Sequence, residues 1–79
     1  MRVFSTNPIS YICFEIGKFY EHTTGDVIAI IGEVNTTRLG PMFVAETAYG
    51  KLIPVGKTEQ DAANYHEITK EKWRKKIWS

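Results

Sequence analysis

Residues 32–41, Gly-Glu-Val-Asn-Thr-Thr-Arg-Leu-Gly-Pro, contain more hydrogen-bonding side chains than a simple turn requires. The apolar runs 27–31 and 42–45 flank them, which predicts two strands joined by a hairpin, and such a connection needs only about two to five residues. Hydroxyl and guanidinium groups bind phosphate and ribose oxygens. Asn and Thr are also ordinary turn residues, so a purely structural role is the alternative. The candidate ligand-binding side chains in this stretch are Thr36, Thr37 and Arg38.

Two further groups of polar residues occur where turns are expected. His22-Thr23-Thr24 precedes Gly25, and Asn64-Tyr65-His66 follows the polar segment 56–63. In a meander of short hairpins some loops must lie at the same end of the sheet, so these groups are expected to converge with the 35–38 segment. Hydroxyls, amides and an arginine together suit a ligand that has phosphates and base edges. The aromatic side chains that would supply faces for stacking are Tyr20, Tyr65 and Trp73.

The sequence does not contain a recognisable catalytic constellation. Neither His22 nor His66 has a serine or cysteine near it in the chain, and no glycine-rich phosphate loop precedes a helix. We therefore predict that the protein is not an enzyme and has no cofactor. His22 and His66 with Glu67 could bind a metal only if folding brought them together, and we predict no metal site. Cys13 is the only cysteine, and its apolar neighbours predict a buried structural thiol.

The charge distribution is uneven along the chain. Residues 1–69 carry five basic and eight acidic side chains, whereas residues 70–79 carry five basic and one acidic. A basic helix end is most often a solvated surface, and it can also attract an anion such as phosphate. The acidic character of residues 1–69 argues against polymeric nucleic acid as a partner.

The chain length of 79 residues indicates one domain, with residues 1–8 as a flexible or partner-docked arm. Alternation and β-branched residues predict an antiparallel sheet over 9–68, and Thr69 is a good N-cap for a helix over 69–78. The fold class is mainly β with a short C-terminal α-helix, arranged as a small curved meander or SH3-like half-barrel. Gly32 predicts a bulge and Pro54 an edge strand. The expected strands are 9–16, 18–22, 27–34, 42–49, 52–55 and 64–68.

The hydrophobic content is high for so short a chain, at 43%. A small domain cannot bury all of this surface, so we expect a homo-oligomer, either a dimer or a tetramer. No apolar run reaches transmembrane length, and the N-terminus does not look like a signal peptide. A cytoplasmic protein that does not contact a membrane is therefore expected.

A set of short motifs between Gly17 and Trp73 resembles a group of small phage-encoded immune-evasion proteins. The motifs, in order, are GKFYEHTTG, GEVNTT, FVAE, PVG, ANYHEI and EKW. The set is similar to the anti-CBASS cyclic-nucleotide sponge family, whose members bind the cyclic oligonucleotide signals of bacterial immunity without cleaving them. The resemblance implies an oligomeric protein of the host bacterial cytosol that sequesters such a signal, a cyclic dinucleotide being favoured. Residues 1–16 match no motif.

Within this interpretation each candidate residue has an expected role that follows from its chemistry. Arg38 would hold a phosphate, and Thr36 and Thr37 would donate to phosphate or ribose oxygens. Asn64 would bind a base edge, Tyr20 or Tyr65 would stack on a base, and His22 would hydrogen-bond nearby. Two alternatives remain open: a protein-binding inhibitor of a host defence effector, and a small single-stranded nucleic-acid-binding module that uses Trp73, Trp78 and the basic tail.

Overall fold

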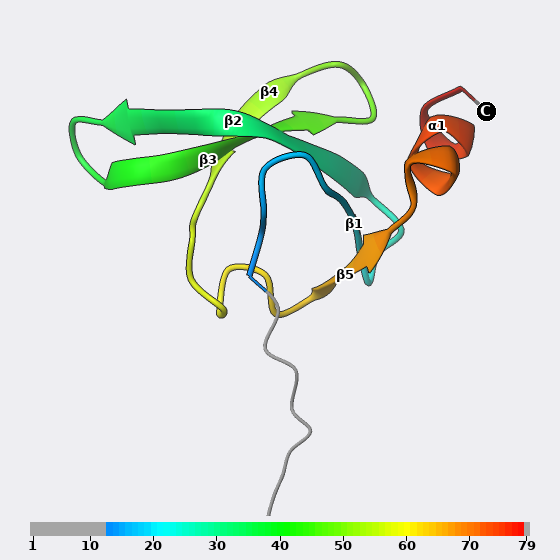
Figure 1. The fold of residues 1–79 in the computed structure, drawn as a ribbon, viewed down its shortest axis with the longest axis horizontal. Coiled ribbons are helices and arrows are strands. Elements are labelled where there is room, and N and C mark those ends of the chain that lie inside the picture. Colours follow the sequence, from blue (N-terminus) through cyan, green and yellow to red (C-terminus); the bar gives the residue numbers. More distant parts are fainter. Residues whose placement is uncertain (1–12, 79) are drawn as a thin grey trace, which may run out of the picture.

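The structure is a computed structural model, and it describes residues 13–78. In this part of the chain, five antiparallel strands and one helix make up the fold (Figure 1). The chain is mainly β with a C-terminal helix, as predicted. The strands lie in the order β4-β3-β2-β1-β5, so β4 and β5 form the two edges and the sheet is not closed. The elements are β1 (Phe19–His22), β2 (Val27–Thr36), β3 (Gly40–Thr47), β4 (Leu52–Val55), β5 (Tyr65–Ile68) and α1 (Lys70–Trp78).

Tight turns at glycines produce the meander. Gly25 and Gly50 have φ angles of 97° and 80°, which side chains disfavour, and they close the β1–β2 and β3–β4 turns. The long β2–β3 hairpin extends well beyond the short strand β1, and β1 and β5 run steeply across it, so the sheet is strongly curved (Figure 1). A register shift between Ile30 and Gly32 confirms the predicted irregularity in β2.

Each face of the sheet has its own hydrophobic core, because side chains alternate along the strands. On one face, Tyr20, Ile28, Ile30 and Ala45 pack with two residues from outside the strands, Phe14 and Ala62.

The opposite face, here called the helix-side face, is covered in part by α1. On this face Trp73 packs with Val27, Ala29 and Ile68, and the half-buried Ile77 lies against the same cluster. The helix-side face therefore carries the side chains of β1, β2 and β5 at positions that alternate with those of the first core.

The start of α1 follows the sequence closely. The Thr69 hydroxyl accepts a hydrogen bond from the Lys72 main-chain N–H at 3.1 Å, which confirms the predicted N-cap. Trp73 is buried, and α1, with nine residues and five basic side chains, is neither long nor apolar enough to cross a membrane. Pro54 lies on the edge strand β4, as expected for a residue without an N–H.

The segment before β1 differs from the prediction. Residues 13–16 form no strand, because the chain turns between Glu15 and Lys18, where the Lys18 N–H donates to the Glu15 carbonyl at 3.2 Å. The expectation that Cys13 is buried is wrong: Cys13 is exposed, and Phe14 occupies the core position instead. The predicted arm 1–8 and the first residues of the predicted strand 9–16 lie outside the described residues.

Candidate functional site

Of the three polar groups that were expected to converge, residues 22–24 and residues 64–66 do meet. In the β1–β5 ladder His22 lies opposite Tyr65, and the two rings contact edge to face at a centroid distance of 4.8 Å. The Thr23 main-chain N–H donates to the Asn64 carbonyl at 3.0 Å. The β1–β2 turn and the start of β5 therefore form one continuous surface.

The third polar group lies at the other end of the molecule. The ten residues of β2 separate the β1–β2 turn from the hairpin tip, which at about 3.3 Å per residue is roughly 30 Å. Figure 1 shows the tip projecting away from β1 and β5. Within one chain, Thr36, Thr37 and Arg38 therefore do not join His22, Asn64 and Tyr65 in a single site.

Thr36 has a structural role in the turn itself. Its hydroxyl donates to the Gly40 carbonyl and accepts the Leu39 N–H, both at 2.9 Å. The Thr36 hydroxyl therefore stabilises the turn, as threonine side chains commonly do. Thr37 and Arg38 are exposed.

Tyr20 belongs to the core and does not offer its ring to a ligand. It is 2% exposed and contacts Phe14 edge to face at 5.0 Å. Its hydroxyl accepts the Glu15 main-chain N–H at 2.9 Å, and burial raises the pKa of the phenol. Tyr20 is an inward position of β1, so the expected base stacking cannot use it in this conformation.

From the two polar groups that meet, Tyr65 alone lines a depression of about 250 Å³ in the described part of the chain. Asp26, at the β1–β2 turn, and Lys51, at the β3–β4 turn, are on its wall, and Ile28 and Ile53 supply apolar lining. The register that places Ile28 opposite Thr47 brings the two turns to the same end of the sheet. The site is therefore built from two hairpins and the start of β5.

The depression combines aromatic, cationic and anionic groups. The Tyr49 ring is 92% exposed, and burial together with the nearby Asp26 carboxylate raises the pKa of the Tyr65 phenol, which is neutral at pH 7. The Thr47 hydroxyl accepts main-chain N–H groups of Tyr49 and Lys51 at 3.3 and 3.2 Å, which shapes the second turn.

Of the polar and aromatic residues that line this depression, only Tyr65 was a predicted site residue; Asp26, Thr47, Tyr49 and Lys51 were not. The available signal was the sequence Tyr-Gly-Lys at a tight turn, where an aromatic ring and a cation are exposed together. The register of β2 with β3, which brings this turn beside Asp26, was needed to use that signal.

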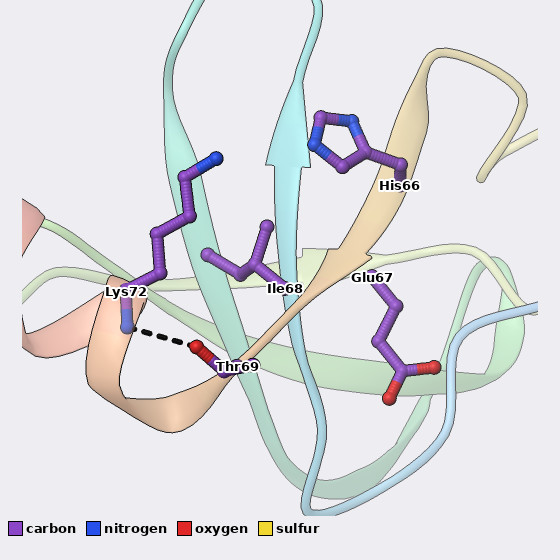
Figure 2. Close-up of a pocket in the computed structure, with 5 residues that line it drawn as sticks. All are labelled: His66, Glu67, Ile68, Thr69 and Lys72. Carbon is purple, nitrogen blue, oxygen red and sulfur yellow. Dashed lines mark hydrogen bonds between the residues drawn. The ribbon is translucent and has the colours of Figure 1, made fainter.

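A second depression, more open to solvent, adjoins the base of α1 (Figure 2). Its lining residues are His66, Glu67, Ile68, Thr69 and Lys72, from the end of β5 and the first turn of the helix. In Figure 2 the dashed line marks the main-chain N–H of Lys72 donating to Thr69, while the lysine side chain extends away from that bond along the strands.

The Glu21 carboxylate lies between a histidine and two lysines of this region. One oxygen is 3.1 Å from Lys72 Nζ and 3.3 Å from His66 Nε2, and the other is 3.2 Å from Lys76 Nζ. Hydrogen bonds from Lys72 and then Lys76 lower the pKa of Glu21. These two lysines therefore tie α1 to β1, and they share one carboxylate.

No group of three or more His, Cys, Asp and Glu side chains in residues 13–78 is arranged to hold a metal ion. His66 faces Glu21 in the β1–β5 ladder, one position away from the pair formed by His22 and Tyr65.

The two tryptophans of the nucleic-acid alternative are placed differently. Trp73 is buried against Phe19, at a ring-centroid distance of 5.7 Å, and only Trp78 is exposed. A stacking surface on α1 would therefore have one tryptophan, beside Arg74 and Lys75, rather than two.

Comparison of the sequence with models of protein families and with curated proteins, and of the fold with solved structures, found no match.

Proposed function

We propose that this protein binds and sequesters a cyclic oligonucleotide immune signal, without cleaving it, in the cytosol of a phage-infected bacterium. The observation that carries the proposal is the depression between Tyr49, Tyr65 and Lys51. It offers what a nucleotide needs from a binding protein: aromatic surface for a base and a cation for a phosphate. A protein that sequesters a ligand requires affinity and a high copy number, but no turnover. Such a site needs neither a catalytic base nor a nucleophile.

The proposed roles differ from those expected from the sequence alone. The Tyr65 ring, with the exposed Tyr49 ring, contacts a base, and the Lys51 ammonium pairs with a phosphate. The Asp26 carboxylate accepts a hydrogen bond from an amino group of the base. His22 and Asn64 border this region and hold the β1–β2 turn and β5 together.

The proposal includes a homo-oligomer. Large exposed hydrophobic side chains, among them Ile31, Val34 and Leu52, are consistent with a subunit interface. Since Thr37 and Arg38 lie about 30 Å from the depression in their own chain, they contribute to a ligand site only if they come from another copy.

The test is a release assay. Purified protein is mixed with a panel of cyclic di- and trinucleotides, free nucleotide is quantified by chromatography, and the quantification is repeated after heat denaturation. We expect one ligand to disappear and to return intact. Return as fragments would identify a phosphodiesterase, and a panel that stays free throughout would contradict the proposal.

Variants then locate the site. Lys51→Ala should weaken binding roughly 10- to 150-fold, the loss of a charge-assisted hydrogen bond of about 1.5–3 kcal/mol. Lys70→Ala, which removes an exposed lysine from the first turn of α1, is the matched control and should bind normally. If Arg38→Ala weakens binding as much as Lys51→Ala, the hairpin tip of another copy completes the site.

A second candidate is a protein-binding inhibitor of a host defence effector. The exposed edge strand β4 favours it, with Leu52 59% exposed next to Pro54. Capture of one defined host protein by the wild type, lost in Leu52→Lys and unaffected by nucleotides, would support this function over the sponge.

A further inference from the structure

Within residues 13–78, the strand β2 has a free edge over its second half. The β1 ladder covers only Val27–Ala29, and the segment before β1 adds bonds to Ile30, where the Ile30 N–H donates to Lys18 and the Ile30 carbonyl accepts from Gly17. Over residues 31–36, no strand of the described chain pairs with the side of β2 that faces away from β3. Main-chain groups on this side are available for another strand.

The ladder with β3 identifies which main-chain groups face the free edge. Asn35 lies opposite Pro41, which has no N–H, so this cannot be a pair that exchanges two hydrogen bonds. The N–H and carbonyl of Asn35 therefore point away from β3, and by the alternation of an antiparallel ladder those of Glu33 do too. The free edge thus presents two donors and two acceptors.

We propose that a second copy of this chain pairs antiparallel with this edge, about a two-fold axis that passes between the two Val34 residues. The side chains of directly opposed residues must point to the same face of the continuous sheet. A two-fold axis normal to the sheet meets this condition when it places one residue opposite the same residue of the second copy. The proposal deepens the homo-oligomer of the proposed function by naming its interface, and it does not depend on the identity of the ligand.

Charge and steric constraints favour Val34 over its neighbours as the position of the two-fold axis. An axis at Glu33 would oppose two carboxylates, which is destabilising. An axis at Gly32 would direct the second strand onto Ile30, which Gly17 and Lys18 already occupy. An axis at Asn35 would leave the main-chain groups of Glu33 unpaired, because it would oppose them to residue 37, which lies in the turn.

The Val34 register satisfies the edge completely. Glu33 lies opposite Asn35 of the second copy, and the two residues exchange both main-chain hydrogen bonds; symmetry repeats this pair, which gives four bonds. The two valines form the closer, non-hydrogen-bonded pair on the helix-side face. Val34 is 40% exposed in the single chain, so pairing covers apolar surface.

The flanking residues are also complementary. In this register the hairpin tip of one copy ends against the turn at residues 15–18 of the other. The tip carries Arg38 and Leu39. The turn carries the exposed Ile16 and Glu15, whose carboxylate is also 3.6 Å from Lys18 Nζ. A cation therefore meets a carboxylate and an apolar side chain meets another. On the opposite face Glu33 is already paired with Lys57, which reduces repulsion between the copies.

Disulfide trapping tests the register directly. Non-hydrogen-bonded antiparallel pairs have the Cβ separation that a disulfide needs. In a Cys13→Ser background, which removes the only native thiol, Val34→Cys should form a covalent dimer in a glutathione redox buffer at least tenfold faster than Leu52→Cys. Leu52 is also exposed and on the helix-side face, so it is the matched control.

The wild-type protein provides two readouts that need no substitution. Light scattering should give twice the chain mass of 9.0 kDa, and the amide hydrogens of Glu33 and Asn35 should be protected from exchange. A dimer mass in which Val34→Cys cross-links no faster than Leu52→Cys would overturn this interface and leave the proposed homo-oligomer standing. A mass of one chain with rapid exchange at Glu33 and Asn35 would overturn both, without bearing on the ligand.

Discussion

At the scale of single residues, Glu21 is the main polar link between the sheet and α1. Its side chain is only 12% exposed and accepts from Lys72 and Lys76, and it lies 3.3 Å from His66. One strand residue thus holds two turns of the helix. Two of the five basic side chains of α1 therefore contribute to the attachment of the helix to the sheet.

The lowered pKa of Glu21 gives a prediction for acid stability. The folded chain binds its proton more weakly than the unfolded chain, whose Glu21 titrates near the ordinary value of 4.5. The stabilisation is therefore present above that pH and is lost as pH falls through the lowered folded pKa. We expect Glu21→Gln to be less stable than wild type at pH 7, with the difference shrinking toward pH 2, as measured by urea unfolding.

The control for this prediction is Glu59→Gln, which changes an exposed glutamate in the 56–64 loop. It should follow the wild-type pH profile. A Glu21→Gln profile parallel to wild type at every pH would mean that the lysine contacts do not stabilise the fold.

Tyr20 links the segment before β1 to the core through its hydroxyl. Tyr20→Phe keeps the ring packing against Phe14 but removes the acceptor of the Glu15 N–H. We expect a loss of about 0.5–1.5 kcal/mol in the free energy of unfolding, measured by urea denaturation. Tyr49→Phe alters a fully exposed ring and should change stability by less than about 0.5 kcal/mol. Equal effects of the two substitutions would contradict this account.

At the scale of secondary structure, α1 is docked by one aromatic residue. Trp73 packs on Val27, Ala29 and Ile68, whereas Trp78 at the end of the helix is exposed. Trp73→Ala should therefore cost about 3–5 kcal/mol and lower the melting temperature strongly. Trp78→Ala, a matched substitution on the same helix, should lower it by little. Circular dichroism melts compare the two, and a large effect of Trp78→Ala would show that the helix end is buried in an assembly.

The elements themselves follow local rules, and so they were predictable. Strand alternation, Gly25 and Gly50 at turns, Pro54 at an edge and Thr69 at a helix start each depend on a few neighbouring residues. The segment 13–16 was not predictable in the same way. Its β-branched and aromatic residues favour a strand, but the turn at Glu15–Lys18 and the core position of Phe14 depend on contacts with distant parts of the chain.

The candidate site was predicted only in part for the same reason. That His22 and Tyr65 face each other depends on the β1–β5 register, which the sequence does not specify locally. Likewise the length of β2, not the polarity of its tip, decides that Thr37 and Arg38 lie far from Tyr65. Residue chemistry identified suitable groups, and strand length and register determined which of them are neighbours.

At the scale of the whole molecule, residues 13–78 bury a small interior and leave a long hairpin uncovered. The buried hydrophobic residues of the described chain cluster where β1, β2 and the middle of β3 meet, while Ile31, Val34 and Leu39 along the hairpin remain exposed. A domain of this size has limited stability by itself. Association through the β2 edge would extend the sheet across two copies and would stabilise both.

Coupling of folding to association makes stability depend on protein concentration. For a dimer, a tenfold increase in concentration adds about 1.4 kcal/mol per dimer, or about 0.7 per chain. In a domain of this length, that difference should raise the melting temperature by roughly 3–5 °C. We expect the wild type to show this rise in calorimetric melts recorded over two decades of concentration.

Val34→Lys places two ammonium groups opposite each other at the proposed axis and should abolish the concentration dependence. Leu52→Lys adds the same charge to the same face on β4, away from the axis, and should keep it. Because both positions are exposed in the single chain, both variants should fold, and their melting temperatures should coincide at the lowest concentration and diverge as concentration rises. If the melting temperature of the wild type does not depend on concentration, the chain is a monomer in which Val34 and Leu39 of the hairpin stay exposed.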